Sequence, residues 1–95
     1  MEKRVLDQDV ITAFYRHLSS AEKSNNTIEK YLRDVRAFMR FADGAEITKE
    51  LVIEYKQKLI DDGYAVRSIN SVIASINSLF EFLGWYDCRV KSLKL

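Results

Sequence analysis

The chain has 95 residues, which suits one compact domain with its own core and leaves no room for a second. Its 47% hydrophobic and 31% charged residues, with a net charge of +1, exclude a disordered or fibrous chain. Apolar runs stay shorter than the roughly eighteen residues that a membrane span needs, and the opening MEKRVLDQDV lacks the apolar core of a signal peptide. We therefore expect a single domain over residues 1–95 in a cytoplasmic protein.

Apolar residues at helical spacing predict an all-α fold, a compact bundle of four helices. The predicted helices cover residues 8–20, 28–42 and 49–62, and a fourth runs from Ser68 to Leu83. Residues whose side chains accept hydrogen bonds from free helix N–H groups are expected to open them, at Asp7, Thr27, Thr48 and Ser68. The expected inward residues are Val10, Ile11, Phe14 and Leu18; Ile28, Tyr31, Leu32, Val35, Phe38, Met39 and Ala42; Leu51, Val52, Tyr55, Leu59 and Ile60; and Ile69, Val72, Ile73, Ile76, Leu79, Phe80 and Leu83. A short fifth helix at the C-terminus is left open.

The chain also aligns with itself at an offset of 41 residues. Predicted caps pair with caps and inward positions with inward positions, for example Asp7 with Thr48, Phe14 with Tyr55, and Thr27-Ile28 with Ser68-Ile69. This predicts a pseudo-twofold bundle of two similar helical hairpins. The alternative is that two unrelated amphipathic hairpins of similar length align by chance, and the fold class is the same in either case.

Under this repeat, the second and fourth helices are counterparts whose outer faces can be compared. Opposite the apolar residues, the second helix carries Lys30, Arg33, Ala37 and Arg40, and the fourth carries Ser71, Ala74, Ser78 and Glu81. One outer face is therefore predicted to be basic, and the other short, polar and mostly uncharged. Bases outnumber acids by six to three over residues 16–40, and acids outnumber bases by six to three over residues 43–62.

The residues offer no convincing enzyme site. His17, the only histidine, stands near the end of the first helix, where an exposed residue is expected. Cys88 is the only cysteine and is expected to be packed in the core or neutral at the surface. The adjacent Asp61 and Asp62 supply too few ligands for a cation. No enzyme activity, cofactor or metal is therefore expected for this segment.

Basic and small polar residues instead suit a binding surface. Free N–H groups at the starts of the second and fourth helices favour an anion, and phosphates can be met by Lys23, Lys30, Arg33, Arg36 and Arg40. The short side chains between Asn70 and Ser78 permit close approach to the fourth helix. A DNA major groove and a close protein interface both admit such a helix, so a protein interaction or dimerisation module is the alternative.

Three stretches together resemble a known family. They are NTIEKYLRDVRAFMRF, with Thr27, Tyr31, Val35, Phe38 and Phe41; then Ile47-Thr48, Val52, Tyr55 and Leu59; and then Gly63 followed by SINSVIASINSLFEFL. Their order and spacing are similar to the N-terminal core-binding domain of tyrosine recombinases, or phage-type integrases. The resemblance runs from about Val10 to Leu93 and implies a SAM-like helical domain that forms half of a C-shaped clamp around duplex DNA.

The resemblance also implies that the second and fourth helices approach DNA across major grooves. The implied contact residues are Lys23, Asn26, Thr27, Lys30, Arg33, Arg67, Asn70, Ser71 and Ser75, with further phosphate contacts from Arg89, Lys91 and Lys94. The family's catalytic residues lie in a C-terminal domain, expected after residue 95, so this segment should not cut DNA by itself and Tyr86 is not the nucleophile. The implied partners are double-stranded DNA, that catalytic domain and other recombinase protomers, for site-specific recombination and DNA integration of a mobile element.

The chain departs from the family pattern in two places. Asp87-Cys88 stands where members often carry Asn-Pro, after the last long helix. Ser71 and Asn77 stand where they often carry basic residues. The second departure predicts weaker phosphate attraction from the fourth helix.

Overall fold

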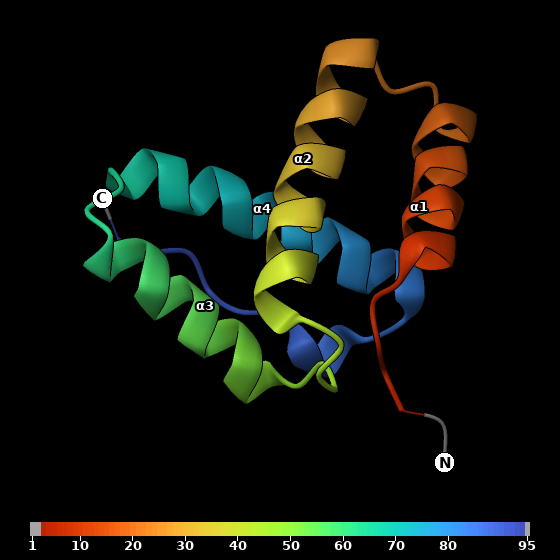
Figure 1. The fold of residues 1–95 in the computed structure, drawn as a ribbon. Helices are drawn as coiled ribbons and strands as arrows, with labels where there is room; N and C mark the ends of the chain where they lie inside the picture. The colour runs from red at the N-terminus through yellow and green to blue at the C-terminus, as the bar shows by residue number, and fades with distance from the viewer. Residues whose placement is uncertain (1–2, 95) are drawn as a thin grey trace.

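The computed structural model describes residues 3–94, which form four α-helices and one short 3-10 helix. The elements are α1 (Gln8–Ser20), α2 (Asn25–Ala42), α3 (Lys49–Asp61), α4 (Val66–Leu83) and η1 (Tyr86–Cys88). α1 and α2 form one hairpin and α3 and α4 the other, and α4 crosses α2 (Figure 1). The predicted all-α fold is confirmed, and the C-terminal helix left open by the sequence is a single 3-10 turn. None of the helices in this part of the chain is long and apolar enough to cross a membrane.

The two hairpins repeat one another at the predicted offset of 41 residues. Moving the bounds of α1 by 41 residues gives those of α3, and the same shift turns α2 into α4. Left-handed backbone follows the repeat, because Glu22 (φ 60°) corresponds to Gly63 (φ 86°) and Asp43 (φ 47°) to Gly84 (φ 77°). Matching positions are buried in both halves: Ile11 with Val52, Phe14 with Tyr55, Val35 with Ile76, and Phe38 with Leu79. The repeat is therefore a property of the backbone and the core.

Three of the four helices are capped by a side chain at the N-terminus. Asp7 and Thr48 cap α1 and α3, as predicted, by accepting hydrogen bonds from backbone N–H groups at 3.0 and 3.1 Å. The predicted cap of α2 is wrong, because the helix begins at Asn25 and Ser24 accepts a hydrogen bond from the N–H of Thr27 at 3.2 Å. Thr27 therefore lies inside the first turn. Two capping residues stand three positions apart here, and periodicity alone favoured the later one.

The start of α4 is also earlier than predicted. The helix begins at Val66 and its N-cap is Ala65, which has no side-chain acceptor, so Ser68 lies in the first turn. Ala65 is the counterpart of Ser24 under the repeat. The start of α4 thus agrees with the repeat, although serine is a better capping residue than alanine.

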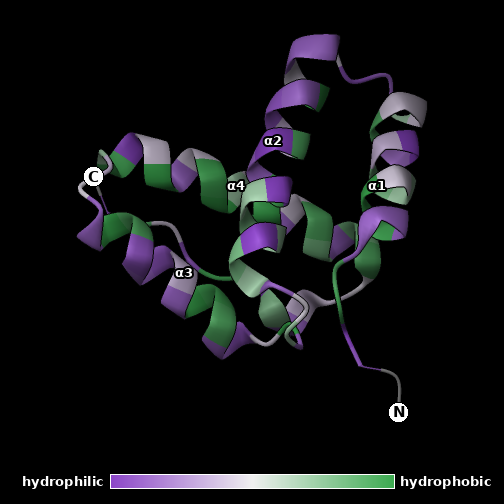
Figure 2. Cartoon of the chain, viewed as in Figure 1, coloured by the Kyte–Doolittle hydropathy of each residue, from purple (hydrophilic) through white to green (hydrophobic). Residues whose placement is uncertain are grey.

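The core lies between the helices, and aromatic rings connect its parts. Phe38 and Phe80 are both 0% exposed, and the Phe38 ring lies 5.1 Å from that of Tyr55 and 6.2 Å from that of Phe80, centroid to centroid. Figure 2 shows hydrophobic residues on the sides of the helices that face one another and hydrophilic residues on their outer sides. The predicted inward position of Ile60 is wrong: the side chain is 38% exposed, because the neighbouring Leu59 takes the buried position.

The uncapped start of α4 predicts a stabilising substitution. Ala65 has φ −63° and ψ 148°, close to the −64° and 156° of Ser24, so a serine can cap α4 from the same backbone conformation. We expect Ala65→Ser to raise the free energy of unfolding by about 1 kcal/mol and Ser24→Ala to lower it by a similar amount. Urea unfolding measures both changes. An Ala65→Ser protein no more stable than the wild type would contradict this account of the cap.

Candidate nucleic-acid interface

A buried ionic cluster joins α2 to α4 where the two helices cross. Asp34 is only 6% exposed, and its Oδ2 accepts hydrogen bonds from Lys30 Nζ (3.0 Å) and Ser75 Oγ (2.7 Å). Lys30 Nζ also donates to Ser75 Oγ (2.8 Å) and to the backbone oxygen of Ser71 (2.9 Å). We call these four residues the Asp34 cluster. Asp34 and Ser75 are counterparts under the repeat, as are Lys30 and Ser71, so the cluster lies beside the pseudo-twofold axis that relates the two halves.

The Asp34 cluster changes the roles of two predicted contact residues, Lys30 and Ser75. Ser75, one of the contact residues that the resemblance implied, is 0% exposed and bonded within the protein. An ammonium group has three N–H donors, and Lys30 uses them within the protein. Lys30 is half-buried and directed at α4 and not outward, whereas only the backbone oxygen of the half-buried Ser71 takes part in the cluster. One signal in the sequence points to this arrangement: Asp34 is a charged residue at an inward position, 41 residues before a serine.

The remaining polar side of α4 holds the C-terminal segment. The side-chain amide of Asn77 donates to the backbone oxygen of Val90 (2.9 Å) and accepts from its N–H (3.1 Å), and Asn70 pairs with Leu93 in the same way (2.9 and 2.7 Å). Segment 89–93 therefore runs back along α4, and Figure 1 shows it passing between α3 and α4. Asn70, another contact residue that the resemblance implied, is engaged by the chain's own backbone. This side of α4 is polar but uncharged because its asparagines bind backbone groups of segment 89–93.

An exposed groove remains between α2 and the start of α4. Its volume is about 310 Å³, and it is lined by Arg33, Asp34, Arg67, Ser68, Ser71 and Val72. The Arg33 side chain is 73% exposed, and Arg67 is exposed as well. Two guanidinium groups from different helices thus flank one groove that also contains serine hydroxyls. Arginine is well suited to phosphate because its planar group donates two parallel hydrogen bonds.

The other predicted contact residues lie outside this groove. Lys23 and Asn26 are exposed and Thr27 is half-buried, all at the start of α2. Asn26 precedes Arg33 by seven residues, which is about two helical turns, so both lie on one side of α2. The predicted phosphate partners in the C-terminal segment are also exposed: Arg89, Lys91 and Lys94.

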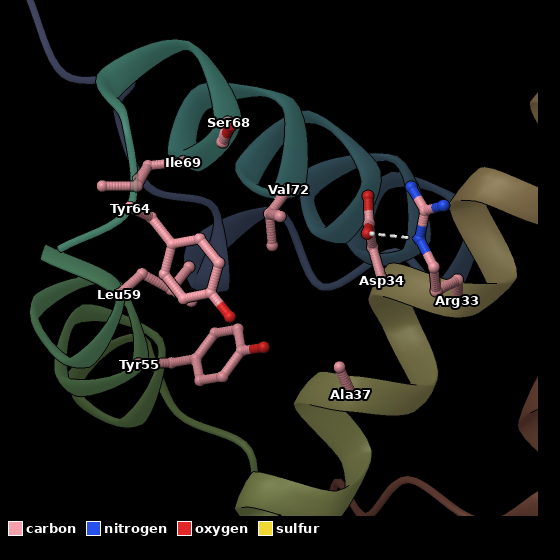
Figure 3. A pocket seen from close by; sticks show the side chains of 9 residues that line it. All are labelled: Arg33, Asp34, Ala37, Tyr55, Leu59, Tyr64, Ser68, Ile69 and Val72. Atoms are coloured by element: carbon pink, nitrogen blue, oxygen red, sulfur yellow. Dashed lines mark ion pairs between the residues drawn. The ribbon is translucent and has the colours of Figure 1, made fainter. Parts of the chain in front are cut away.

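A smaller, mostly apolar pocket of about 240 Å³ shares residues with the groove (Figure 3). The rings of Tyr55 and Tyr64 line it beside Leu59. Burial raises the pKa of the Tyr55 hydroxyl above its ordinary value. Within residues 3–94 no group of three or more metal-ligating side chains lies close enough together to hold an ion. The arginines and serine hydroxyls of the groove offer charge and hydrogen bonds to a ligand.

The two terminal segments are tied together on another side of the molecule. Arg4 Nη1 donates to both carboxylate oxygens of Asp87 (2.8 and 2.9 Å), and its guanidinium carbon lies 5.5 Å from the ring centroid of Trp85. The hydrogen bond from Arg4 lowers the pKa of Asp87. Cys88 is fully buried, and burial raises the pKa of its thiol. Of the two expected environments, the core and the surface, the structure places Cys88 in the core. The residues that depart from the family's Asn-Pro pattern thus anchor the C-terminal segment.

The fold is an all-α domain of two related helical hairpins, and comparison with known proteins identifies its family. The family described as phage integrase, N-terminal SAM-like domain, matches residues 11–86. The tyrosine recombinase XerA of Pyrococcus horikoshii is 32% identical over 92 residues, which cover 97% of this chain and 31% of the relative. The tyrosine recombinase XerD of Halalkalibacterium halodurans is 32% identical over 76 residues, which cover 70% of this chain and 25% of the relative. No solved structure matches the chain.

The chain belongs to the family of phage integrase N-terminal SAM-like domains. The predicted resemblance is thereby confirmed. The chain spans less than a third of the length of these curated relatives.

The asparagine contacts predict where the C-terminal segment loosens. Asn77→Ala removes the acceptor of the Val90 N–H, and Asn70→Ala that of the Leu93 N–H. A hydrogen bond contributes about 1 kcal/mol, so amide exchange at the affected residue should become roughly fivefold faster. Hydrogen exchange followed by NMR measures each amide separately. Asn26→Ala, which removes an exposed asparagine of α2, is the matched control and should leave both amides unchanged. If the Val90 amide in Asn77→Ala and the Leu93 amide in Asn70→Ala exchange no faster than in the wild type, the assigned hydrogen bonds are contradicted.

The contact between Arg4 and Asp87 predicts a pH-dependent contribution to stability. Because the folded pKa of Asp87 is lowered, the unfolded chain binds this proton more readily than the folded one. The stabilising contribution is complete above the ordinary value of 3.8 and is lost as pH falls through the lower folded value. Arg4→Ala should therefore lower the free energy of unfolding at neutral pH, and the deficit should shrink in acid. Denaturant unfolding across this pH range measures it, with Arg16→Ala as the control. A deficit that stays constant into acid would exclude this ionic origin.

Proposed function

We propose that this chain is the DNA-binding domain of a tyrosine recombinase and that it binds duplex DNA through α2 and the first turns of α4. The observation that carries the proposal is the placement of Arg33 and Arg67 on two helices that flank one groove, in a chain of the phage integrase family. Phosphate contacts of this kind position a protein on DNA, and contacts to base edges specify the sequence. Both kinds of group are available at this surface.

The start of α4 supports the phosphate contacts. Ala65 supplies no capping side chain, so the backbone N–H groups of the first turn remain available to an anion, with Arg67 and Ser68 beside them. The start of α2 adds the exposed Lys23 and Asn26, and Thr27 beside them. Attraction would come chiefly from Lys23, Arg33 and Arg67, and the short polar contacts from Asn26, Thr27 and Ser71.

The three other residues of the expected contact set are proposed to act indirectly. Lys30 and Ser75 hold α2 against α4, and Asn70 holds the C-terminal segment. Their polar groups are satisfied within the chain and gain little by binding DNA. Contact with DNA is accordingly assigned to fewer residues than the sequence pattern suggested.

The wider roles rest on the family and on the length of its members. Within a longer protein, the domain would form half of a clamp around duplex DNA, and a catalytic domain after residue 95 would form the other half. It would act with other protomers in site-specific recombination and DNA integration. The segment itself would bind DNA without cutting it, because the catalytic residues of such recombinases are expected in that other domain.

A helical interaction or dimerisation module has less support. That alternative required the short polar side of α4 to be open to a partner. Instead Asn70 and Asn77 bind the chain's own C-terminal segment, and Ser75 is buried against α2. Concentration-dependent dimerisation without DNA binding would favour the alternative.

Titration of duplex DNA at several ionic strengths tests the proposed function. If about three phosphates are engaged, log K should fall with log salt at a slope near −2.7. Arg33→Ala should weaken binding and reduce the steepness of this slope by about 1, with little effect on folding because the side chain is exposed. Lys49→Ala removes the same charge outside the groove and should change binding far less. No binding of the wild type at low salt would refute the proposal, and unchanged affinity in folded Arg33→Ala would remove that residue from the contact surface.

A further inference from the structure

The Asp34 cluster leaves one carboxylate oxygen directed to a different partner. Oδ2 of Asp34 is used by Lys30 and Ser75, whereas Oδ1 lies 3.6 Å from Nε of Arg33. Among residues 3–94 no hydrogen bond reaches Oδ1. Figure 3 shows the Arg33 guanidinium alongside the Asp34 carboxylate, with Nε on the side that faces the carboxylate. The buried acid thus faces the internal cluster with one oxygen and an exposed arginine with the other.

This geometry leaves the phosphate-binding edge of Arg33 free. An ion pair through Nε constrains the side chain and leaves both terminal amino groups available, and these form the edge that meets a phosphate in parallel hydrogen bonds. A long side chain that is already oriented loses less conformational entropy when it binds. The constraint matters because Arg33 is 73% exposed and has no other ion pair within residues 3–94.

The same carboxylate also fixes the opposite side of the groove. Ser75 and Lys30 connect Asp34 to α4, and Arg67 lies in the first turn of that helix. Asp34 itself lines the groove together with both arginines. One buried residue is therefore connected to each of the two groups that flank the groove, directly on one side and through α4 on the other.

We propose that Asp34 is a positioning residue for DNA binding, which orients Arg33 through the ion pair at Nε and holds α4, with Arg67, at a fixed place across the groove. The proposal rests on the proposed function of the groove in binding DNA phosphates. It assigns a negatively charged residue a favourable role at a surface that binds a polyanion.

Whether loss of the Asp34 charge weakens or tightens DNA binding distinguishes positioning from simple electrostatics. Asp34→Asn removes a negative charge next to the groove, so electrostatics alone predicts tighter binding to DNA. If Asp34 served only the fold, the variant would unfold at lower temperature but the folded protein would bind DNA no less tightly. Positioning predicts weaker binding by the folded protein, by about two- to tenfold, as expected when one long side chain must be immobilised on binding.

The experiment is a double-mutant cycle on DNA affinity, carried out well below the unfolding temperature of every variant. Wild type, Asp34→Asn, Arg33→Ala and the double variant are titrated with the same duplex at one low ionic strength. We expect the loss caused by Asp34→Asn to be smaller in the Arg33→Ala background, because the oriented arginine is absent there. Equal or tighter binding by folded Asp34→Asn, or a loss unaffected by Arg33→Ala, would overturn the proposal.

A measurement on the wild type keeps the proposal testable if Asp34→Asn does not fold, and it needs no DNA. The Nε–H group of Arg33 should show restricted motion in NMR relaxation, compared with that of Arg36, which is exposed on the same helix and has no ion pair within residues 3–94. Equal mobility of the two groups would refute the positioning of Arg33. If Arg33 is restricted but the wild type binds no DNA, the proposed function fails and the orienting contact stands.

Discussion

The structure depends on the carboxylate of Asp34, which is buried where α2 crosses α4. A buried charge is costly unless it is paired and hydrogen-bonded, and breaking such a pair by removing one partner leaves that cost uncompensated. Asp34 meets the requirement with Lys30 from its own helix and Ser75 from the counterpart helix. Because these contacts join equivalent positions of the two hairpins, they also set how the two halves of the molecule sit against each other.

Part of the polar surface of α2 and α4 is used within the domain. Lys30, Asn70, Ser75 and Asn77 all appear in the sequence as surface groups, yet each is satisfied inside the domain. The asparagines serve a different need from the cluster, because segment 89–93 is neither helix nor strand and its backbone groups require acceptors and donors from side chains. Polar residues on a helix can thus be hydrogen-bonded within the domain, and only the other polar residues are available to bind a partner.

The fold was predictable to within a few residues because its signals are local. Apolar residues at helical spacing, together with caps such as Asp7 and Thr48, define four helices, and the 41-residue repeat places them in two hairpins. The starts of α2 and α4 were missed by part of a turn. At α2 two capping residues, Ser24 and Thr27, stand close together and the earlier one is used, whereas α4 begins after Ala65 despite the better capping residue Ser68.

The sequence by itself determined the helices, their repeat, most of the buried apolar residues and the family, since periodicity and spacing carry that information directly. Only the tertiary structure decided which polar groups are free. Helical periodicity gives the direction of a side chain from its own axis, but not whether another helix or segment lies in that direction. Arg33 and Arg67, thirty-four positions apart, come to flank one groove because α2 crosses α4 at the Asp34 cluster, and Ser75 is lost from the surface for the same reason.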